Sequence, residues 1–155
     1  MRLLLLRHAN ADTEAARDED RELSAKGVKQ AKNVARFCKE HAIEVPLVVS
    51  SPVVRALQTA KRVAEHLGSR LVVEPWLACG MEPETALEKL RDFGVEPALM
   101  LVGHEPDFSA LAAHLLGLSS GVKLEFRKAT LMALDVESIE RGGARLDFSI
   151  PSRLM

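Results

Sequence analysis

The sequence has little cysteine, almost no net charge and no long apolar run, and each absence excludes a class of protein. Two cysteines, Cys38 and Cys79, are too few and too isolated for a disulfide framework or a zinc site, so we expect reduced thiols. The formal net charge is −1, which argues against nucleic acid or an anionic membrane as a partner. No apolar stretch approaches the ~18 to 20 residues of a membrane span.

We expect neither a signal peptide at the apolar start of the sequence nor a domain boundary in its interior. The apolar run at 3–6 stops at Arg7 and His8, short of the ~7 to 15 residues of a signal-peptide core, so we expect a cytoplasmic protein. No repeat, low-complexity tract or Pro/Gly/Ser linker divides the chain. The length of 155 residues and a hydrophobic content of 47% predict one domain over 1–155. Dinucleotide binding is not expected, because no Gly-x-Gly-x-x-Gly follows the first apolar run.

Strand-like and helix-like segments alternate along the chain, which predicts an α/β domain with a mostly parallel sheet. Helices are expected near 24–41, with Ser24 as the cap, and near 53–66, 83–93 and 107–116. Strands are expected at 3–6, 47–49, 71–74, 98–102, 124–126, 131–136 and 144–150. The acidic segment 12–22 is expected to be a loop. A turn around 141–143 joins the last two strands, which predicts an antiparallel edge.

Three of these strand ends carry polar and basic side chains. Arg7 and His8 follow the first strand, Ser-Ser-Pro at 50–52 precedes a helix that opens with Arg55, and Gly-His-Glu-Pro at 103–106 follows the strand at 98–102. Ligands of an open parallel sheet collect at the carboxyl ends of its strands. Two imidazoles and two guanidinium groups at that edge predict a pocket for a compact, doubly charged anion such as phosphate.

The residue types in this pocket indicate phosphoryl transfer. A neutral imidazole is a nucleophile at neutral pH, and neighbouring cations favour its uncharged form. His8 is therefore expected to accept a phosphoryl group and pass it to water, with no metal and no cofactor. Arg7, Arg55 and a protonated His104 are expected to hold the three outer oxygens of the transferred group. Each residue alone also fits a structural role, and only their joint order favours a site.

The segments around these residues also match known motifs. Arg7-His8-Ala9 differs from an Arg-His-Gly hallmark only by its alanine, the stretch at 51–60 is close to Ser-Pro-x-x-Arg-Ala-x-Gln-Thr-Ala, and Val-Gly-His-Glu-Pro stands at 102–106. In these motifs the sequence resembles the histidine phosphatase superfamily, a phosphoglycerate-mutase-like group. The resemblance implies a three-layer α/β/α domain in which a mostly parallel sheet has an antiparallel edge strand.

Within that superfamily the chain is most similar to the SixA-type phosphohistidine phosphatases. They share its short length and an Arg-x-Leu-Ser-x-x-Gly stretch, present here at 21–27. The resemblance implies that His8 is the phosphorylated nucleophile and that Arg21 contacts the substrate. The phosphate clamp that it implies consists of Arg7, Arg55, His104 and the backbone N–H of Glu105.

The sequence offers one candidate for a general acid in the predicted site. Larger relatives that act on phosphate esters place a carboxylic acid beside the leaving oxygen and add a lid, whereas the segment 76–82 is brief. Glu82 is the candidate acid, and a solvated loop carboxylate is the alternative reading. A phosphohistidine needs such an acid less than an ester does, because imidazole, with a pKa of ~6.5, leaves more readily than an alkoxide.

These observations predict a metal-independent phosphatase that removes phosphate from phosphohistidine on a partner protein through a phosphohistidine intermediate. One alternative is a phosphatase of small phosphate esters, for which Glu82 would have to act as the acid. A second is a non-catalytic phosphoprotein-binding module, although binding alone would not require the nucleophile His8. A mutase is disfavoured because no lid would protect the intermediate from water. The histidines at 41, 66 and 114 are expected to have no chemical role.

Overall fold

The structure is a computed structural model that describes residues 1–119 and 123–155. The strands are β1 (Arg2–Arg7), β2 (Leu47–Ser50), β3 (Arg70–Val73), β4 (Ala98–Gly103), β5 (Leu131–Val136) and β6 (Ala144–Ile150). The α-helices are α1 (Ala25–Glu40), α2 (Val54–Leu67), α3 (Pro83–Arg91) and α4 (Asp107–Leu115). Short 3₁₀ helices lie at Asp18–Asp20, Pro75–Leu77 and Ser152–Leu154. The predicted order of helices and strands is confirmed, with one exception described below.

All six strands belong to one sheet, in the order β3-β2-β4-β1-β5-β6. The first four in this order pair in parallel, β5 pairs antiparallel with β1, and β6 pairs antiparallel with β5. The predicted mostly parallel sheet with an antiparallel margin is therefore confirmed. Because β2, β4 and β1 are neighbours, their carboxyl ends open side by side at one edge of the sheet.

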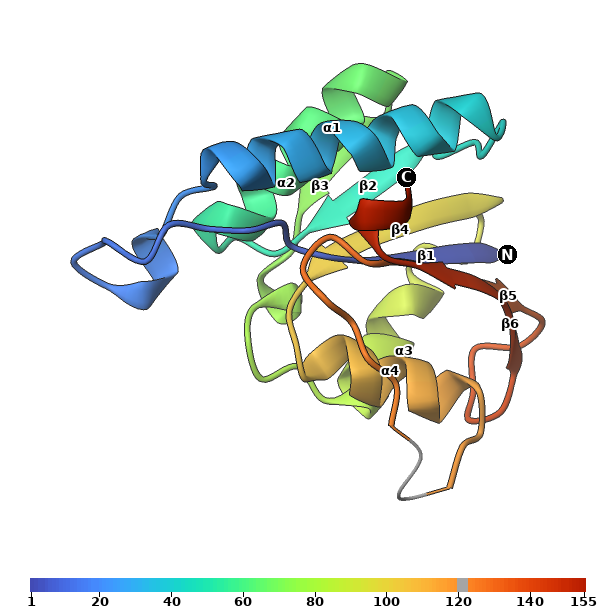
Figure 1. Ribbon diagram of the computed structural model, residues 1–155. Coiled ribbons are helices and arrows are strands. Elements are labelled where there is room, and N and C mark those ends of the chain that lie inside the picture. The colour runs from blue at the N-terminus through green and yellow to red at the C-terminus, as the bar shows by residue number, and fades with distance from the viewer. Residues whose placement is uncertain (120–122) are drawn as a thin grey trace.

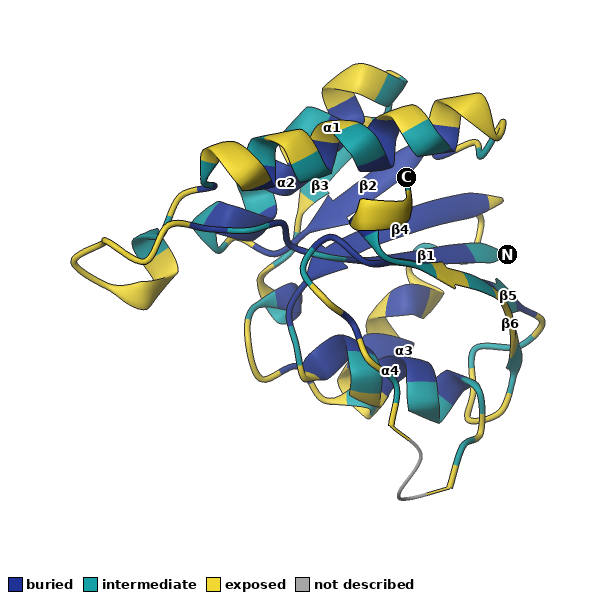
Figure 2. Cartoon of the chain, viewed as in Figure 1, coloured by how far each residue is buried: buried dark blue, intermediate teal, exposed yellow. Residues whose placement is uncertain are grey.

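Helices cover both faces of the sheet, α1 and α2 on one face and α3 and α4 on the other (Figure 1). Successive leucines of β1 face opposite layers: Leu3 and Leu5 pack with α3 and α4, and Leu4 and Leu6 pack with α1 and α2. Burial on both faces explains why β1 is a continuous apolar run rather than an alternating one. Each buried leucine contributes about 1.5–3 kcal/mol. The helix sides that face the sheet are correspondingly buried (Figure 2), which completes the three-layer α/β/α domain.

Helix α1 is fixed at its start by a cap and by close packing. Ser24 Oγ accepts a hydrogen bond from the Gly27 N–H at 3.1 Å, as the sequence predicts for a capping serine. Gly27 packs directly on the backbone of Asn10, since a Cβ added there would lie 1.9 Å from the Asn10 carbonyl oxygen. The helix therefore holds the segment that follows His8 against the sheet.

The predicted strand at 124–126 is wrong. This segment has no strand pairing and runs as a loop. The Phe126 side chain is buried and packs edge-on against Phe108, while its carbonyl oxygen accepts a hydrogen bond from the Arg7 side chain. Its apolar character thus comes from core packing and not from a place in the sheet.

The acidic segment 12–22 is a loop, as predicted, and it projects from the body of the molecule (Figure 1). A bridge between Ala11 and Leu23 closes its base, and the short 3₁₀ helix at Asp18–Asp20 forms within it. No helix in the described ranges is both long and apolar enough to cross a membrane.

Candidate active site

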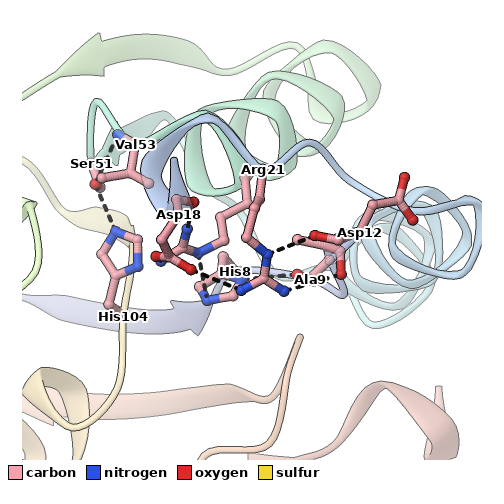
Figure 3. Close-up of polar contacts among 10 residues, drawn as sticks. His8, Ala9, Asp12, Asp18, Arg21, Ser51, Val53 and His104 are labelled. Carbon is pink, nitrogen blue, oxygen red and sulfur yellow. Dashed lines mark hydrogen bonds and ion pairs between the residues drawn. The ribbon is translucent and has the colours of Figure 1, made fainter. Parts of the chain in front are cut away.

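Three neighbouring strands deliver side chains to one point, at the carboxyl edge of the sheet (Figure 3). His8 follows β1, His104 follows β4 and Ser51 follows β2. The backbone pairing continues past the strand ends, since the His8 N–H donates to the Gly103 carbonyl and the Ser51 N–H to the Val102 carbonyl, both at 2.9 Å. The two imidazole rings lie 5.3 Å apart between centroids. The structure thus brings His8 and His104 together, as the sequence predicts.

The His8 ring has one nitrogen bound to the backbone and one facing Arg55. Nδ1 lies 2.8 Å from the Ala9 carbonyl oxygen, which can only accept a hydrogen bond, so Nδ1 carries the ring proton. Nε2 therefore has a free lone pair, and it accepts a hydrogen bond from Arg55 Nε at 3.3 Å. Only 6% of His8 is exposed, so this orientation is held by packing as well as by hydrogen bonding.

The His104 ring is held by Ser51 on one side and faces the site on the other. Its Nε2 lies 2.8 Å from Ser51 Oγ, and the same oxygen accepts a hydrogen bond from the Val53 N–H at 3.2 Å. Its Nδ1 is buried and has no hydrogen-bond partner in the described part of the chain. With 2% of the residue exposed, an unpartnered ring nitrogen is a group that a bound ligand would satisfy.

Both imidazoles are neutral in the free protein. Burial lowers the pKa of His8 to about 3, and the nearby His104, Arg55 and Arg7 add to that effect. Burial also lowers the pKa of His104 to about 4, with Arg55 and Arg7 again contributing. The lowered pKa of His8 agrees with the neutral state expected for it, and in the free protein burial and two guanidinium groups oppose a positive charge on His104.

Arg55 lies in the first turn of α2 but on its buried side, with 7% of the residue exposed. Besides its contact with His8, its Nη1 donates to the Asp18 carbonyl at 2.8 Å, and its Nη2 pairs with the Asp18 carboxylate at 3.0 Å. The helix turn around it is fixed by Thr59, whose hydroxyl donates to the Arg55 carbonyl and accepts from the Ala9 N–H. Arg55 is thus a preorganised cation beside Nε2 of His8.

Arg7 is the second cation of the site, and it is partly exposed. Its Nη1 donates to the Phe126 carbonyl at 2.7 Å, while its buried Nε has no partner in the described residues. Burial lowers the pKa of Arg7, and Arg55 lowers it further, although Glu105 acts in the opposite direction. The guanidinium of Arg7 therefore retains a donor that an anion could bind.

Arg21 and Asp18 connect the projecting loop to the site (Figure 3). Arg21 Nη1 pairs with the Asp18 carboxylate at 2.9 Å, and its Nε donates to the Asp12 carbonyl at 2.6 Å. In this position Arg21 braces Asp18 and the backbone at the base of the loop. Asp18 itself was not foreseen, because its place in an acidic run predicts only a solvated loop.

Neither Glu82 nor Glu105, the two glutamates singled out from the sequence, has its carboxylate bound to His8 or His104. The Glu105 N–H donates to no other residue in the described ranges, so it is available to a ligand, whereas the Glu105 carboxylate is bound by the backbone and hydroxyl of Ser109. Glu82 is exposed at the start of α3 and caps no backbone group. The preceding backbone is tied down by Asp107, whose carboxylate accepts from Gly80 and Met81 N–H.

The remaining sulfur and imidazole groups form no second centre. Cys38 is buried and Cys79 is exposed, and both are free thiols. The histidines at 41, 66 and 114 lie at the ends of α1, α2 and α4. Among the described residues, no group of three or more His, Cys, Asp or Glu side chains is arranged to hold a metal ion.

Comparison with known proteins agrees with this geometry. Residues 3–78 match the family model of the histidine phosphatase superfamily, branch 1. The phosphohistidine phosphatase SixA of Escherichia coli strain K12 is 31% identical over 120 residues, which cover 74% of each chain. A solved structure of the protein histidine phosphatase SixA complexed with tungstate superposes with a TM-score of 0.87 over 99% of each chain, at 23% identity. A mycobacterial glucosyl-3-phosphoglycerate phosphatase has the same fold, with a TM-score of 0.78 at 21% identity over 95% of this chain and 97% of that one. The chain therefore belongs to the histidine phosphatase superfamily.

Proposed function

We propose that this protein hydrolyses phosphohistidine on other proteins and that His8 carries the phosphoryl group between substrate and water. The orientation of His8 is the observation that carries the proposal. Its Nδ1–H is bound to the Ala9 carbonyl, so the nucleophilic lone pair on Nε2 faces Arg55. Because the pKa of His8 is lowered to about 3, this lone pair is present throughout the physiological pH range.

The reaction proceeds in two displacements at phosphorus. In the first, the substrate phosphohistidine carries a proton on its other ring nitrogen. His8 Nε2 forms a bond to phosphorus while the bond between phosphorus and the substrate imidazole breaks, and that imidazole departs as a neutral ring that keeps this proton. In the second, water attacks the phosphorus, its proton passes to the phosphate, and the bond to His8 breaks. Inorganic phosphate leaves and His8 regains its lone pair.

The surrounding donors stabilise the charge on the transferred group. Arg55 and Arg7 supply two fixed cations, and the Glu105 N–H supplies a backbone donor. His104 contributes as a neutral donor: when the Ser51 hydroxyl donates to Nε2, the ring proton sits on Nδ1, the buried nitrogen that has no partner among the described residues. One such contact is worth about 3–4 kcal/mol in the transition state. A charged His104 is therefore not required before the phosphate arrives.

The local structure around Glu82 supports phosphohistidine over a phosphate ester as substrate. The Glu82 side chain is exposed, and its carboxylate makes no hydrogen bond or ion pair with another described residue. The short segment before it is held by Asp107, which accepts hydrogen bonds from the Gly80 and Met81 N–H groups. An imidazole leaving group tolerates such a site, because its departure depends little on a protein acid. Similarity to SixA over three quarters of the chain supports the same substrate class.

The test compares phosphate release from a protein phosphorylated on histidine with phosphoramidate and from 4-nitrophenyl phosphate, both in EDTA. We expect faster release from the phosphoprotein, and loss of both activities in His8→Ala. The matched control is His66→Ala, which removes an exposed imidazole at the far end of α2 and should change neither rate. A rapidly quenched reaction should contain an acid-labile phosphoenzyme in the wild type and none in His8→Ala.

Glu82→Gln separates the two substrate classes. Under the proposal, this variant hydrolyses the phosphoprotein within about twofold of the wild-type rate. A wild-type preference for the aryl ester, together with a loss of at least about 100-fold in Glu82→Gln, would replace the proposal with a small-ester phosphatase. Binding of the phosphoprotein without turnover would identify a recognition module.

A further inference from the structure

A second pocket, of about 320 Å³, lies beside the proposed active site, and its lining is basic. The residues that line it are Asn10, Lys26, Gln30, Arg127, Lys128, Pro151, Ser152 and Arg153. Four of them are cations and none is an acid, although the chain as a whole has a net charge of −1. The proposed mechanism uses none of these side chains.

The two amide side chains of this basic pocket have their oxygens occupied and their nitrogens free. Asn10 Oδ1 accepts a hydrogen bond from the Ser24 hydroxyl at 2.7 Å, and Gln30 Oε1 accepts from the Asn10 N–H at 2.8 Å. Neither amide nitrogen donates to another residue in the described ranges. Because a backbone N–H can only donate, this network also fixes which end of Gln30 is the oxygen. The amide groups of the pocket that have no hydrogen-bond partner are therefore N–H donors, which are the groups that bind an anion.

The wall of the basic pocket is built onto the backbone of the proposed nucleophile. Lys128 precedes Ala129, whose N–H is shared between the carbonyl oxygens of Arg7 and His8, each at 3.2 Å. Ala129 is buried and has a φ of 58°, a left-handed conformation that costs an alanine about 1–2 kcal/mol. Strain of this kind persists where the surrounding structure requires it, commonly at functional sites. Here it ties the backbone directly after Lys128 to the carbonyl oxygens of Arg7 and His8.

Three of the four cations of this pocket have no ion-pair partner among the described residues. Lys26, Lys128 and Arg153 form no ion pair with the described residues, and Arg127 pairs with the exposed Glu125 at 3.0 Å. Burial lowers the pKa of Lys128, and Arg21, Arg7, Arg55 and Lys26 lower it further. Lys128 therefore lies in a positive field continuous with that of the active site, and an anion bound there would relieve the repulsion.

We propose that the basic pocket binds a carboxylate of the same protein that presents its phosphohistidine to His8. The enzyme would then select phosphohistidines that have an acidic side chain close by on the partner's surface. Carboxylates are the fixed anions that a protein surface carries, which matches the charge of the pocket. This inference rests on the proposed function. It assigns Lys26 and Lys128 to substrate specificity, because they would contact the partner's carboxylate and not its phosphohistidine.

The test uses two synthetic phosphohistidine peptides that differ only in having Asp or Asn at the positions flanking the phosphohistidine. We expect the wild type to prefer the Asp peptide about tenfold in kcat/KM, and the preference to shrink in 0.5 M NaCl. The double variant Lys26→Gln/Lys128→Gln should lose about tenfold on the Asp peptide and less than about twofold on the Asn peptide. The control Lys39→Gln removes an exposed lysine at the other end of α1 and should change neither.

The other possible results would refute either the carboxylate site or the proposed function. Equal wild-type rates on the two peptides, or an equal loss on both in the double variant, would refute the carboxylate site while leaving the proposed function intact. No hydrolysis of either peptide, with turnover of phenyl phosphate, would refute the proposed function and this inference with it. If the double variant loses rate on 4-carboxyphenyl phosphate but not on phenyl phosphate or on either peptide, the carboxylate belongs to a small substrate and not to a protein surface.

Discussion

Replacing Ser51 with alanine tests whether His104 acts as a neutral donor. The Ser51 oxygen lies 2.8 Å from His104 Nε2 and accepts from the Val53 N–H. Under the proposed mechanism its hydroxyl hydrogen points to Nε2, which leaves the ring proton on Nδ1, facing the phosphate. Ser51→Ala removes the only group in the described residues that sets this tautomer, without touching the nucleophile.

The expected size of the effect follows from the burial of the ring. Loss of the hydrogen bond and the unsatisfied Nε2 that remains should cost about 1–2 kcal/mol in unfolding free energy. Incorrect placement of the ring proton should lower kcat/KM by about tenfold, which corresponds to about 1.4 kcal/mol. Ser50→Ala is the matched control, since this buried hydroxyl donates to the Ser51 carbonyl and not to a histidine. It should reduce stability and leave kcat/KM within about twofold.

The assays are kcat and KM for 4-nitrophenyl phosphate, urea unfolding, and ¹⁵N NMR of the histidine rings. Wild-type His104 should show a protonated Nδ1 and a bare Nε2, and Ser51→Ala should show a mixture of tautomers. A protonated Nε2 in the wild type would refute the reasoning, as would a Ser51→Ala variant with undiminished kcat/KM.

Three further predictions concern pH, the loop and packing. Because the pKa values of His8 and His104 are lowered to about 3 and about 4, their contribution to stability is complete above about pH 6.5. Below about pH 6.5 the unfolded chain takes up a proton on each of these histidines and the native protein does not. The free energy of unfolding should therefore fall, between pH 6.5 and 4, by about 1.4 kcal/mol per pH unit for each histidine. Urea unfolding at about pH 7 to 4.5 measures this loss. Asp18→Asn should lower the inhibition constant of tungstate about threefold, since the carboxylate that competes for Arg55 is removed. Gly27→Ala should lower the free energy of unfolding by about 3 kcal/mol, because its Cβ would collide with a backbone carbonyl.

Contrary results would be equally specific. Titration of the two histidine ring signals near pH 6.5 would contradict their burial as neutral groups. Weaker tungstate inhibition in Asp18→Asn would mean that the carboxylate positions Arg55 instead of competing for it. An unchanged urea midpoint in Gly27→Ala would show that α1 can move away from the loop after His8.

Much of the fold and part of the site could be predicted from local sequence. The continuous apolar runs of β1 and β4 predict strands buried on both faces, and the charged residues that stop them predict where ligands gather. His8 and His104 could be found in this way because each directly follows such a strand. The same reasoning wrongly predicts a strand at 124–126. There the apolar side chains pack in the core, and the backbone carbonyl of Phe126 accepts a hydrogen bond from Arg7 instead of pairing in the sheet.

Other features depend on tertiary contacts that no local pattern encodes. The charge state of His104 could not be predicted because it follows from burial next to two arginines. Arg55 has the spacing of a surface residue on an amphipathic helix, and only the packing of α2 against the sheet buries it. Asp18 lies 37 residues before its partner Arg55, and Lys128 stands in a loop with no motif. Such pairings become visible only after the chain is folded.

The pairing of β1 with β4 has a consequence for how activity arises during folding. Leu3 to Leu6 pair with Leu99 to Val102, so the two imidazoles meet only after segments almost a hundred residues apart have joined at the centre of the sheet. No fragment or partly folded species that lacks this pairing can hold both histidines in place. Recovery of phosphatase activity during refolding would therefore time the closure of this long-range pair, a step that helix-sensitive spectroscopy does not resolve.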